Sequence, residues 1–350
     1  MLPSVSALHR LVLSLLVLPA FFLTVYLITS FPNPPSPPLI HSSLSSLPRS
    51  SSSWSIYPED YYEGGAYVTL PHGRVRYWLA GPEDGRKIVL IHGLSIPSIV
   101  WKDVAPVLAS HGYRVLLYDL YGRGYSDAPQ VTYDVSLHTM QLALLMQHIK
   151  WDKSFVVGLS MGGGIATTFT VQFPHLVNGK VALIASGGII ESTDIARTAK
   201  FMSSPLVQTV SSLPPFRHYM RHLANASDSS ELESLHHIRE IVRLQSAHLP
   251  YYNAAVASCL RDGPIRGLTS AFATLANTSN QVLLIHGTAD KTVPYKYASK
   301  MQALVPHAEL VTIEEGGHDI TVTRATEVNA ALLQFLSRPP QRSVKQTVLS

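Results

Sequence analysis

The chain has 350 residues, of which 46% are hydrophobic and 14% charged, and its formal net charge is +4. This length suits one large α/β domain with room for an inserted subdomain. Because no dense cluster of Lys and Arg accompanies the small positive charge, the sequence predicts no nucleic-acid partner. Cys259 is the single cysteine, so an intramolecular disulfide is excluded. It has no catalytic-cysteine signature around it and is interpreted as a small buried apolar residue.

Residues 11–31 form an uncharged, mostly apolar run that follows Arg10. About 20 such residues suffice to cross a bilayer as a helix. The run also exceeds the roughly 7–15-residue apolar core of a cleavable signal peptide. Because positive charge tends to stay cytoplasmic, residues 1–31 are predicted to be a signal anchor, with the rest of the chain luminal or extracellular. A long signal peptide that is cleaved, giving a secreted protein, is the alternative.

A Pro- and Ser-rich stretch follows at residues 32–56. It lacks the apolar periodicity of a packed element, and repeated proline favours extended backbone. We therefore predict a linker between the membrane and a folded domain. Sequons at Asn225 and Asn277 fit glycosylation of a luminal protein, although such short matches are common by chance.

From residue 57 the pattern is that of a folded domain. Residues 66–70 and 74–79 alternate around a Pro-His-Gly turn and predict an antiparallel hairpin. Short unbroken apolar runs then predict strands buried on both faces, at residues 87–92, 113–119, 154–158, 180–185, 281–286 and 309–313. Segments with helical periodicity separate most of these runs. The predicted fold class is therefore α/β, a mostly parallel sheet flanked by helices.

Residues 188–280 interrupt the alternation of strands and helices. The interval contains several segments of helical pattern, and an interval this long inside a compact domain usually has structure of its own. We predict an inserted helical cap at 188–280, a core formed by 57–187 and 281–340, and a tail at 341–350. Ligands of such sheets bind beyond the carboxyl ends of the strands, so the residues at those ends are the candidates for a site.

Ser160 is the candidate nucleophile. It lies in Gly158-Leu159-Ser160-Met161-Gly162, after a predicted strand and before a helical segment. Glycines two residues before and after the serine allow a sharp strand-to-helix turn without side-chain clashes. The helix that follows would direct backbone N–H groups at a developing oxyanion. The alternative is a glycine-rich turn that carries an ordinary surface serine.

A serine hydroxyl needs a base to become a nucleophile. Among 16 histidines, His318 is selected by its position after the predicted strand 309–313, in a glycine-rich turn. Asp290, which follows the predicted strand 281–286, is the predicted acid that orients the imidazole. Glu191 is the fallback acid. Asp319 is set aside, since neighbours in sequence seldom point at each other.

His92-Gly93-Leu94 follows the predicted strand 87–92. Gly93 allows a turn that exposes the next backbone N–H. The N–H groups of Leu94 and Met161 are therefore expected to form a two-donor oxyanion hole. His92 itself is expected to brace the loop rather than to react.

Five segments in this order resemble the α/β-hydrolase superfamily, in the branch that holds monoacylglycerol lipases and carboxylesterases. They are His92-Gly93, residues 119–126, Gly158–Gly162, residues 287–290 and residues 316–318. The resemblance covers about residues 68–336. It implies Leu94 and Met161 as oxyanion donors, a structural loop at Asp119, and no metal or organic cofactor. Epoxide hydrolases and haloalkane dehalogenases are set aside because they have Asp where Ser160 stands.

The predicted activity is hydrolysis of carboxylic esters through an acyl-enzyme on Ser160. The apolar N-terminal segment favours a lipophilic small-molecule substrate, such as a monoacylglycerol or a lysolipid. Three alternatives stay open on the same scaffold: a ligand receptor without turnover, an acyltransferase, and a carbon–carbon bond hydrolase. Fold alone does not choose among them.

Overall fold

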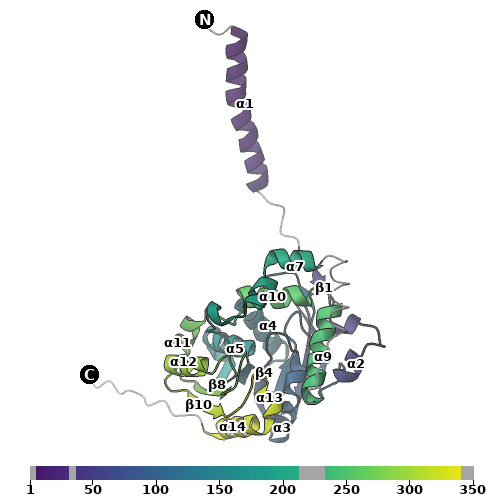
Figure 1. Ribbon diagram of the computed structural model, residues 1–350, viewed down its shortest axis with the longest axis vertical. Helices are drawn as coiled ribbons and strands as arrows, with labels where there is room; N and C mark the ends of the chain where they lie inside the picture. Colours follow the sequence, from purple (N-terminus) through teal and green to yellow (C-terminus); the bar gives the residue numbers. More distant parts are fainter. Residues whose placement is uncertain (1–4, 31–36, 213–232, 340–350) are drawn as a thin grey trace, which may run out of the picture. The chain divides into compact units, whose positions relative to one another are not determined.

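The computed structural model describes residues 5–30, 37–212 and 233–339 (Figure 1). Internal contacts divide the chain into two compact units, Met1–Leu39 and Ile40–Ser350. The predicted tail at 341–350 and the sequon at Asn225 lie outside the described residues.

In the first unit, helix α1 (Val5–Ser30) contains residues 11–30 of the apolar run and includes Pro19. The hydroxyls of Thr24 and Thr29 donate to carbonyls one turn earlier. None of the helices in the described ranges combines the length and the apolar character needed to cross a membrane. The predicted single-pass anchor, and the luminal or extracellular placement derived from it, are therefore wrong. The uncharged run specifies a helix, but a lack of charge is a weaker requirement than the continuous apolar length of a span.

In the second unit, eight of the described strands form one sheet in the order β10-β9-β8-β7-β4-β5-β3-β2. β2 pairs with β3 and β3 with β5 in antiparallel fashion, and the other neighbours are parallel. The prediction of a mostly parallel sheet is confirmed. The bounds are β2 (Ala66–Leu70), β3 (Gly73–Ala80), β4 (Arg86–Ile91), β5 (Tyr113–Tyr118), β7 (Ser154–Leu159), β8 (Val177–Ile184), β9 (Gln281–Gly287) and β10 (Glu309–Ile313).

Each central strand buries both of its faces, which explains the unbroken apolar runs. Along β4, Ile88 and Leu90 join one hydrophobic cluster, whereas Val89 and Ile91 join the other. Helices α3 (Ala105–Ser110) and α14 (Ala325–Ser337) pack into the first cluster. Helices α4 (Val135–His148), α5 (Met161–Gln172) and α12 (Lys296–Leu304) pack into the second. The sheet therefore has a layer of helices on each face.

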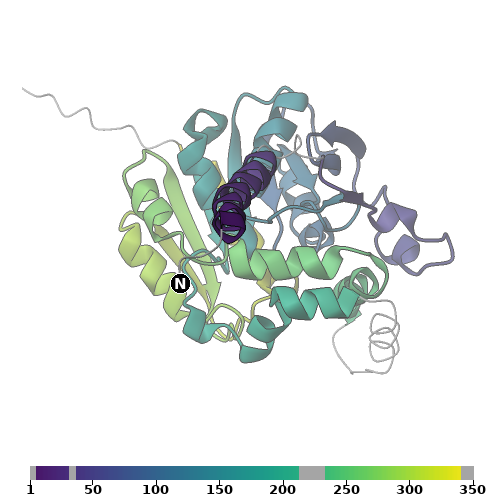
Figure 2. The same ribbon diagram turned by 90° about the horizontal axis from the view of Figure 1, so that it is seen from above.

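Helices fill the described part of the interval between β8 and β9. They are α6 (Arg197–Met202), α7 (Pro205–Ser212), α9 (Glu233–His248), α10 (Tyr252–Asp262) and α11 (Thr269–Ala276). Helix α10 contacts α6, α7 and α9, and Figure 2 shows this group from above in teal and green. Ala255 and Cys259 of α10 are fully buried in the second cluster, so this helix packs on the core.

Residues 40–56, expected to belong to a linker, pack against the core instead. The short strand β1 (Ile40–His41) pairs with β6 (Ala128–Pro129), and α2 (Ser53–Ile56) follows. Leu44 is fully buried, and the Trp54 indole N–H donates to backbone carbonyls. Isolated anchors of this kind leave no periodic pattern, which is why the sequence did not reveal the packing.

Candidate active site

Ser160 lies in the tight turn between β7 and α5. Its backbone adopts φ 55° and ψ −119°, a conformation that residues other than glycine rarely take. A Cβ on Gly158 would lie 2.1 Å from the Gly162 carbonyl oxygen, and one on Gly162 would lie 2.2 Å from the Ile91 carbonyl oxygen. Close backbone approach therefore requires both glycines of the motif. The turn presents the serine side chain at the carboxyl end of β7.

His318 bridges Ser160 and Asp290. Its Nε2 lies 2.9 Å from Ser160 Oγ, and its Nδ1 lies 2.8 Å from Asp290 Oδ2. His318 comes from the loop between β10 and α13 (Ile320–Thr323), and Asp290 from the loop after β9. The Asp290 side chain is fully buried, whereas that of His318 is 27% exposed. The acid is thus shielded from water while the imidazole remains accessible.

The second oxygen of Asp290 is also occupied. Oδ1 accepts hydrogen bonds from the backbone N–H groups of Thr292 and Val293, both at 2.8 Å. Burial raises the pKa of the Asp290 carboxyl, but the hydrogen bonds from His318 and these two N–H groups outweigh it and leave the pKa lowered. The ionised Asp290 can only accept a hydrogen bond at Oδ2, so Nδ1 of His318 bears the proton. Nε2 of the neutral imidazole then has a free lone pair and can accept the serine proton.

His286, which was not among the residues expected at the site, supports the loop of Asp290. Its Nε2 lies 2.8 Å from the Val293 carbonyl oxygen and 3.5 Å from Asp290 Oδ2. Burial lowers the pKa of His286, and this effect exceeds the rise caused by Val293 and Asp290. The ring is therefore neutral, and its Nε2–H donates to the Val293 carbonyl oxygen. A signal was present in the sequence, because His286 stands at the end of the strand that leads to Asp290.

Met161 follows the nucleophile in the chain, and Leu94 belongs to the loop after β4. Met161 is the first residue of α5, where a backbone N–H has no acceptor within the helix. The loop after β4 runs beside the serine, since a Cβ on Gly93 would lie 3.3 Å from Ser160 Cβ. In residues 37–212 and 233–339, neither the Leu94 N–H nor the Met161 N–H donates to another protein group. Both donors are available to an oxyanion.

His92 fixes the orientation of this loop. Its Nε2 accepts from the Leu120 N–H at 2.9 Å, so Nδ1 must bear the proton and donates to the Gly93 carbonyl oxygen at 3.0 Å. Burial lowers the pKa of His92 to about 3, which keeps the ring neutral. Because the C=O and N–H of a trans peptide point in opposite directions, holding the Gly93 oxygen also sets the direction of the Leu94 N–H.

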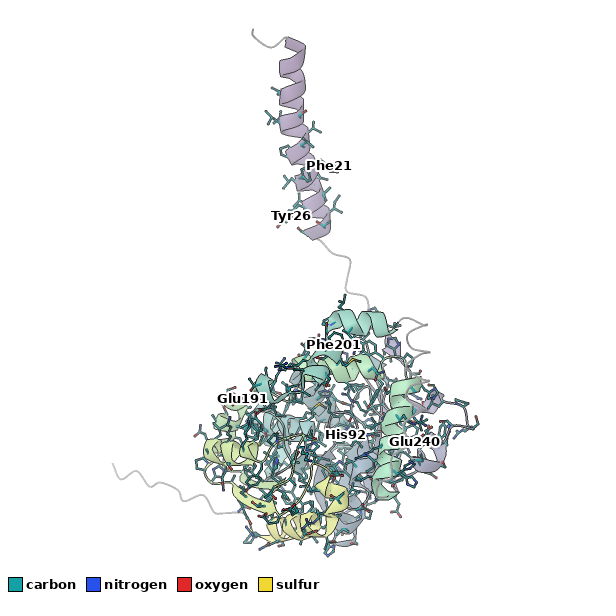
Figure 3. All side chains as sticks on the ribbon, in the orientation of Figure 1. Phe21, Tyr26, His92, Glu191, Phe201 and Glu240 are labelled. Carbon is teal, nitrogen blue, oxygen red and sulfur yellow. The ribbon has the colours of Figure 1, made fainter. Side chains whose placement is uncertain are left out.

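Asp119, expected to belong to a structural loop, and Glu191, the fallback acid, both make contacts away from His318. Asp119 is buried and accepts from the Tyr57 hydroxyl and from the N–H groups of Ser98 and Tyr125. Burial raises the pKa of Asp119 to about 6, despite these hydrogen bonds. Glu191, the fallback acid, lies at the surface, where it pairs with Lys300 (Figure 3). His92, by contrast, is fully buried.

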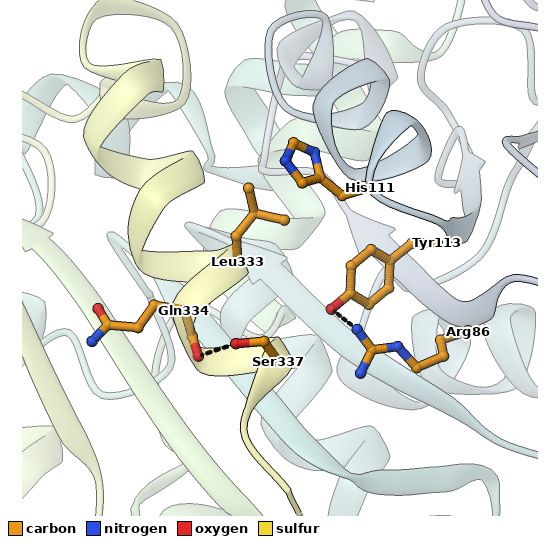
Figure 4. Close-up of a pocket in the computed structure, with 6 residues that line it drawn as sticks. All are labelled: Arg86, His111, Tyr113, Leu333, Gln334 and Ser337. Carbon is orange, nitrogen blue, oxygen red and sulfur yellow. Dashed lines mark hydrogen bonds between the residues drawn. The ribbon is translucent and has the colours of Figure 1, made fainter.

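One cavity lies at the amino ends of the strands, opposite to the carboxyl ends that hold Ser160. It has a volume of about 370 Å³ and is lined by Arg86, His111, Tyr113, Leu333, Gln334 and Ser337 (Figure 4). Arg86 and Tyr113 are the first residues of β4 and β5, so the cavity is remote from Ser160. In the described parts of the chain, no three or more His, Cys, Asp or Glu side chains are grouped to hold a metal ion.

The sheet, the strand-to-helix turn and the Ser160–His318–Asp290 contacts are those of an α/β hydrolase. Residues 87–325 match the family model described as alpha/beta hydrolase fold, and the chain belongs to this family. The superfamily expected from the motifs is thereby confirmed, and the protein is a hydrolase.

Known proteins of several activities resemble the chain. An uncharacterized protein of Mycobacterium tuberculosis is 30% identical over 262 residues, which cover 71% of this chain and 74% of the relative. The 2-hydroxy-6-oxo-2,4-heptadienoate hydrolase of Pseudomonas putida is 27% identical over 246 residues, covering 68% and 84%. The crystal structure of a bromoperoxidase from Bacillus anthracis has a TM-score of 0.64 at 22% identity, covering 78% of this chain and 100% of that chain. These relatives are compatible with the lipase and carboxylesterase branch but do not select it.

Proposed function

We propose that this protein is a serine hydrolase that cleaves carboxylic esters through an acyl-enzyme on Ser160. The main support is the pair of contacts through His318, with Nε2 2.9 Å from Ser160 Oγ and Nδ1 2.8 Å from Asp290 Oδ2. A serine in contact with an imidazole that is itself held by a buried carboxylate is arranged to lose its proton.

In the first half of the reaction, His318 Nε2 accepts the hydroxyl proton as Ser160 Oγ attacks the ester carbonyl carbon. The carbonyl oxygen becomes an oxyanion and accepts hydrogen bonds from the N–H groups of Leu94 and Met161. The charged Asp290 stabilises the imidazolium that forms. When the tetrahedral intermediate collapses, the bond to the alkoxy oxygen breaks. His318 gives its proton to that oxygen, and the alcohol leaves.

In the second half, His318 removes a proton from a water molecule that attacks the acyl-enzyme. The bond between the acyl carbon and Ser160 Oγ then breaks, and the proton held by His318 returns to Ser160. The carboxylic acid is released, and the site regains its starting protonation. All of these steps use side chains and backbone groups of the chain itself.

We further propose a lipophilic ester as the substrate, of the monoacylglycerol or lysolipid type, with residues 188–280 as a cap over the core of 57–187 and 281–340. Support comes from the apolar residues that follow the site along the chain. The Gly187 N–H donates to the carbonyl oxygen of Ser160 itself, and Ile189 and Ile190 follow after one more glycine. Both isoleucines are half-buried against a hydrophobic cluster, as a wall for an acyl chain would be.

A carbon–carbon bond hydrolase is the second candidate. Its support is that relatives named 2-hydroxy-6-oxo-2,4-heptadienoate hydrolase and 2-hydroxy-6-oxo-6-(2'-aminophenyl)hexa-2,4-dienoic acid hydrolase are 27% and 26% identical to this chain. Such a substrate contains an enol and a carboxylate instead of an ester. Spectrophotometric assay of a vinylogous 1,5-diketone substrate would therefore distinguish it from an esterase.

The test is labelling of the protein with a fluorophosphonate probe, followed by assay on p-nitrophenyl esters of increasing chain length and on monoacylglycerols. Wild type and the exposed-serine control Ser299→Ala should label equally, whereas Ser160→Ala should not label. Ester turnover should fall by about 10⁶-fold in Ser160→Ala, since removal of a triad nucleophile has an effect of this size.

Each other outcome has a defined meaning. A folded wild type that does not label would overturn the catalytic proposal and favour a receptor that binds without turnover. Labelling combined with transfer of the acyl group to an added alcohol, rather than to water, would identify an acyltransferase. Turnover of short esters only would overturn the lipophilic substrate class and leave the esterase proposal intact.

A further inference from the structure

The loop beside the nucleophile is held at three consecutive carbonyl groups. His92 Nδ1 donates to the Gly93 oxygen at 3.0 Å. Arg123 Nε donates to the Leu94 oxygen at 2.8 Å, and the Tyr252 hydroxyl donates to the Ser95 oxygen at 2.8 Å. All three donor side chains are buried. Each peptide plane of the loop therefore has a fixed orientation that does not depend on solvent.

Two of these donors connect the loop to helix α10. Tyr252 is the first residue of α10, so its hydroxyl is a direct bond from this helix to the loop. Arg123 reaches α10 through Nη2, which lies 3.2 Å from the sulfur of Cys259. Tyr252 and Cys259 are two helical turns apart and thus lie on the same face of α10. One face of an inserted helix is accordingly linked to the loop at two adjacent peptides, directly through Tyr252 and indirectly through Arg123.

Arg123 is an unusual buried cation. It is fully buried, yet no carboxylate forms an ion pair with it among the described residues. The third guanidinium nitrogen, Nη1, donates to the Tyr121 carbonyl oxygen at 3.1 Å, and Cζ lies 5.6 Å from the ring centre of Tyr133. A buried charge without a counter-ion destabilises a fold. The planar guanidinium nevertheless fixes the relative positions of three acceptors, which a flexible ammonium group does not do.

We propose that α10 positions the oxyanion hole, with Tyr252 and Arg123 as positioning residues for the Leu94 N–H. The inference rests on the proposed function, because that N–H matters for catalysis only if an oxyanion forms beside Ser160. The Leu94 N–H belongs to the Gly93–Leu94 peptide, which His92 holds at the Gly93 oxygen. Fixing the Leu94 and Ser95 carbonyls holds the next two peptides, and so limits the backbone rotation at Leu94 that would tilt this N–H. The Leu94 N–H then keeps its direction towards the nucleophile, and its alignment depends on where α10 packs.

The test compares Tyr252→Phe with the matched control Tyr251→Phe. The first variant removes the hydroxyl bound to Ser95 and keeps the buried ring. The control removes the neighbouring hydroxyl, from a half-buried residue whose ring stacks on His41 at 4.8 Å. Turnover number and KM on a p-nitrophenyl ester are measured, together with the affinity of a trifluoromethyl ketone, which forms a tetrahedral adduct with the serine.

We expect kcat to fall about 10-fold in Tyr252→Phe with KM unchanged, as for the loss of about one hydrogen bond in the transition state only. Affinity for the trifluoromethyl ketone should fall by a similar factor, whereas Tyr251→Phe should match wild type in both measurements. Cys259→Ala, which removes the contact of Arg123 with α10, should shift kcat and ketone affinity in the same direction. This second variant also serves if the first one does not fold.

An increase in KM with kcat unchanged in Tyr252→Phe, or an equal loss in Tyr251→Phe, would overturn the inference. So would wild-type kcat and ketone affinity in both Tyr252→Phe and Cys259→Ala. These failures differ from failure of the proposed function, in which wild type itself shows neither fluorophosphonate labelling nor ester turnover.

Discussion

The carboxyl and amino ends of the parallel strands form two edges of the central sheet, and their polar groups differ in whether they have hydrogen-bond partners. At the carboxyl edge, Ser160 has a strained backbone, and the N–H groups of Leu94 and Met161 have no acceptor in the described chain. At the amino edge, Lys180 Nζ donates to the carbonyl oxygens of Phe335 and Leu336 at 2.8 and 3.0 Å and also to that of Arg338. One buried cation at this edge, Lys180, thus binds the carbonyls at the end of α14.

The difference separates groups that serve stability from groups that serve chemistry. Cations near the last turn of a helix bind its free carbonyls and interact favourably with its dipole, so the amino edge stabilises the fold. Strain and unused donors cost stability and are found where a substrate supplies the missing partner. Substitutions at the carboxyl edge should therefore change turnover, and those at the amino edge should change the free energy of unfolding.

After Ser160→Ala, the largest effect should come from Asp290→Asn at the carboxyl edge. The amide can offer an N–H to Nδ1 and so stabilise the tautomer that has its proton on Nε2, facing Ser160. We expect kcat on an ester to fall about 10⁴-fold, the size of effect that loss of a triad acid has in serine proteases. The free energy of unfolding should change far less. Asp319→Asn, beside His318, is the control, and similar losses in both variants would contradict the assignment of Asp290.

A smaller effect, of a different kind, is expected from Lys180→Met at the amino edge. The apolar side chain fills similar space but leaves the carbonyls of Phe335 and Arg338 without their donor. We expect a loss of about 3 kcal/mol in the free energy of unfolding, measured with urea. Ester turnover should be that of wild type, as for the exposed control Lys153→Met. A large loss of turnover in the folded variant would mean that the two edges are not separate in function.

The smallest effect should be a change in pH dependence for His92→Asn. The pKa of His92 is about 3 in the native state against a usual 6.5, so below 6.5 only the unfolded chain gains a proton there. Its contribution to wild-type stability is complete above 6.5 and falls by about 1.4 kcal/mol per pH unit as the pH decreases. Between about pH 7.5 and about pH 5, this term should lower the free energy of unfolding of wild type by about 2 kcal/mol. His92→Asn should not show this loss.

The measurement is urea unfolding of wild type and His92→Asn at both pH values. Asp119, with a pKa raised to about 6, contributes with the opposite sign, but it does so equally in the two proteins and cancels in their difference. Equal pH dependence in the two proteins would show that His92 takes up a proton in the native state. That result would count against its role as a neutral brace of the Gly93 carbonyl.

Much of the candidate site was predictable because its signals are local. Ser160 is flanked by glycines that close contacts require, and Asp290 and His318 each follow a strand. Parallel strands bring their carboxyl ends to one edge, so a pattern of strands is enough to expect these residues near each other. The N-terminal segment shows the limit of such signals. Its uncharged run specifies a helix, but the inference of a membrane span was wrong.

By itself, the sequence determined the strands, the glycine-rich turn at Ser160 and the order of the residues that meet at His318, because short-range patterns encode them. Only the tertiary structure decided which side chains hold those residues in place. Arg123 reaches Leu94 and Cys259, and Tyr252 reaches Ser95, across large distances in sequence. Such contacts depend on how α10 packs against the core. No periodicity along the chain specifies that packing, because each contact joins one residue to another without a repeat.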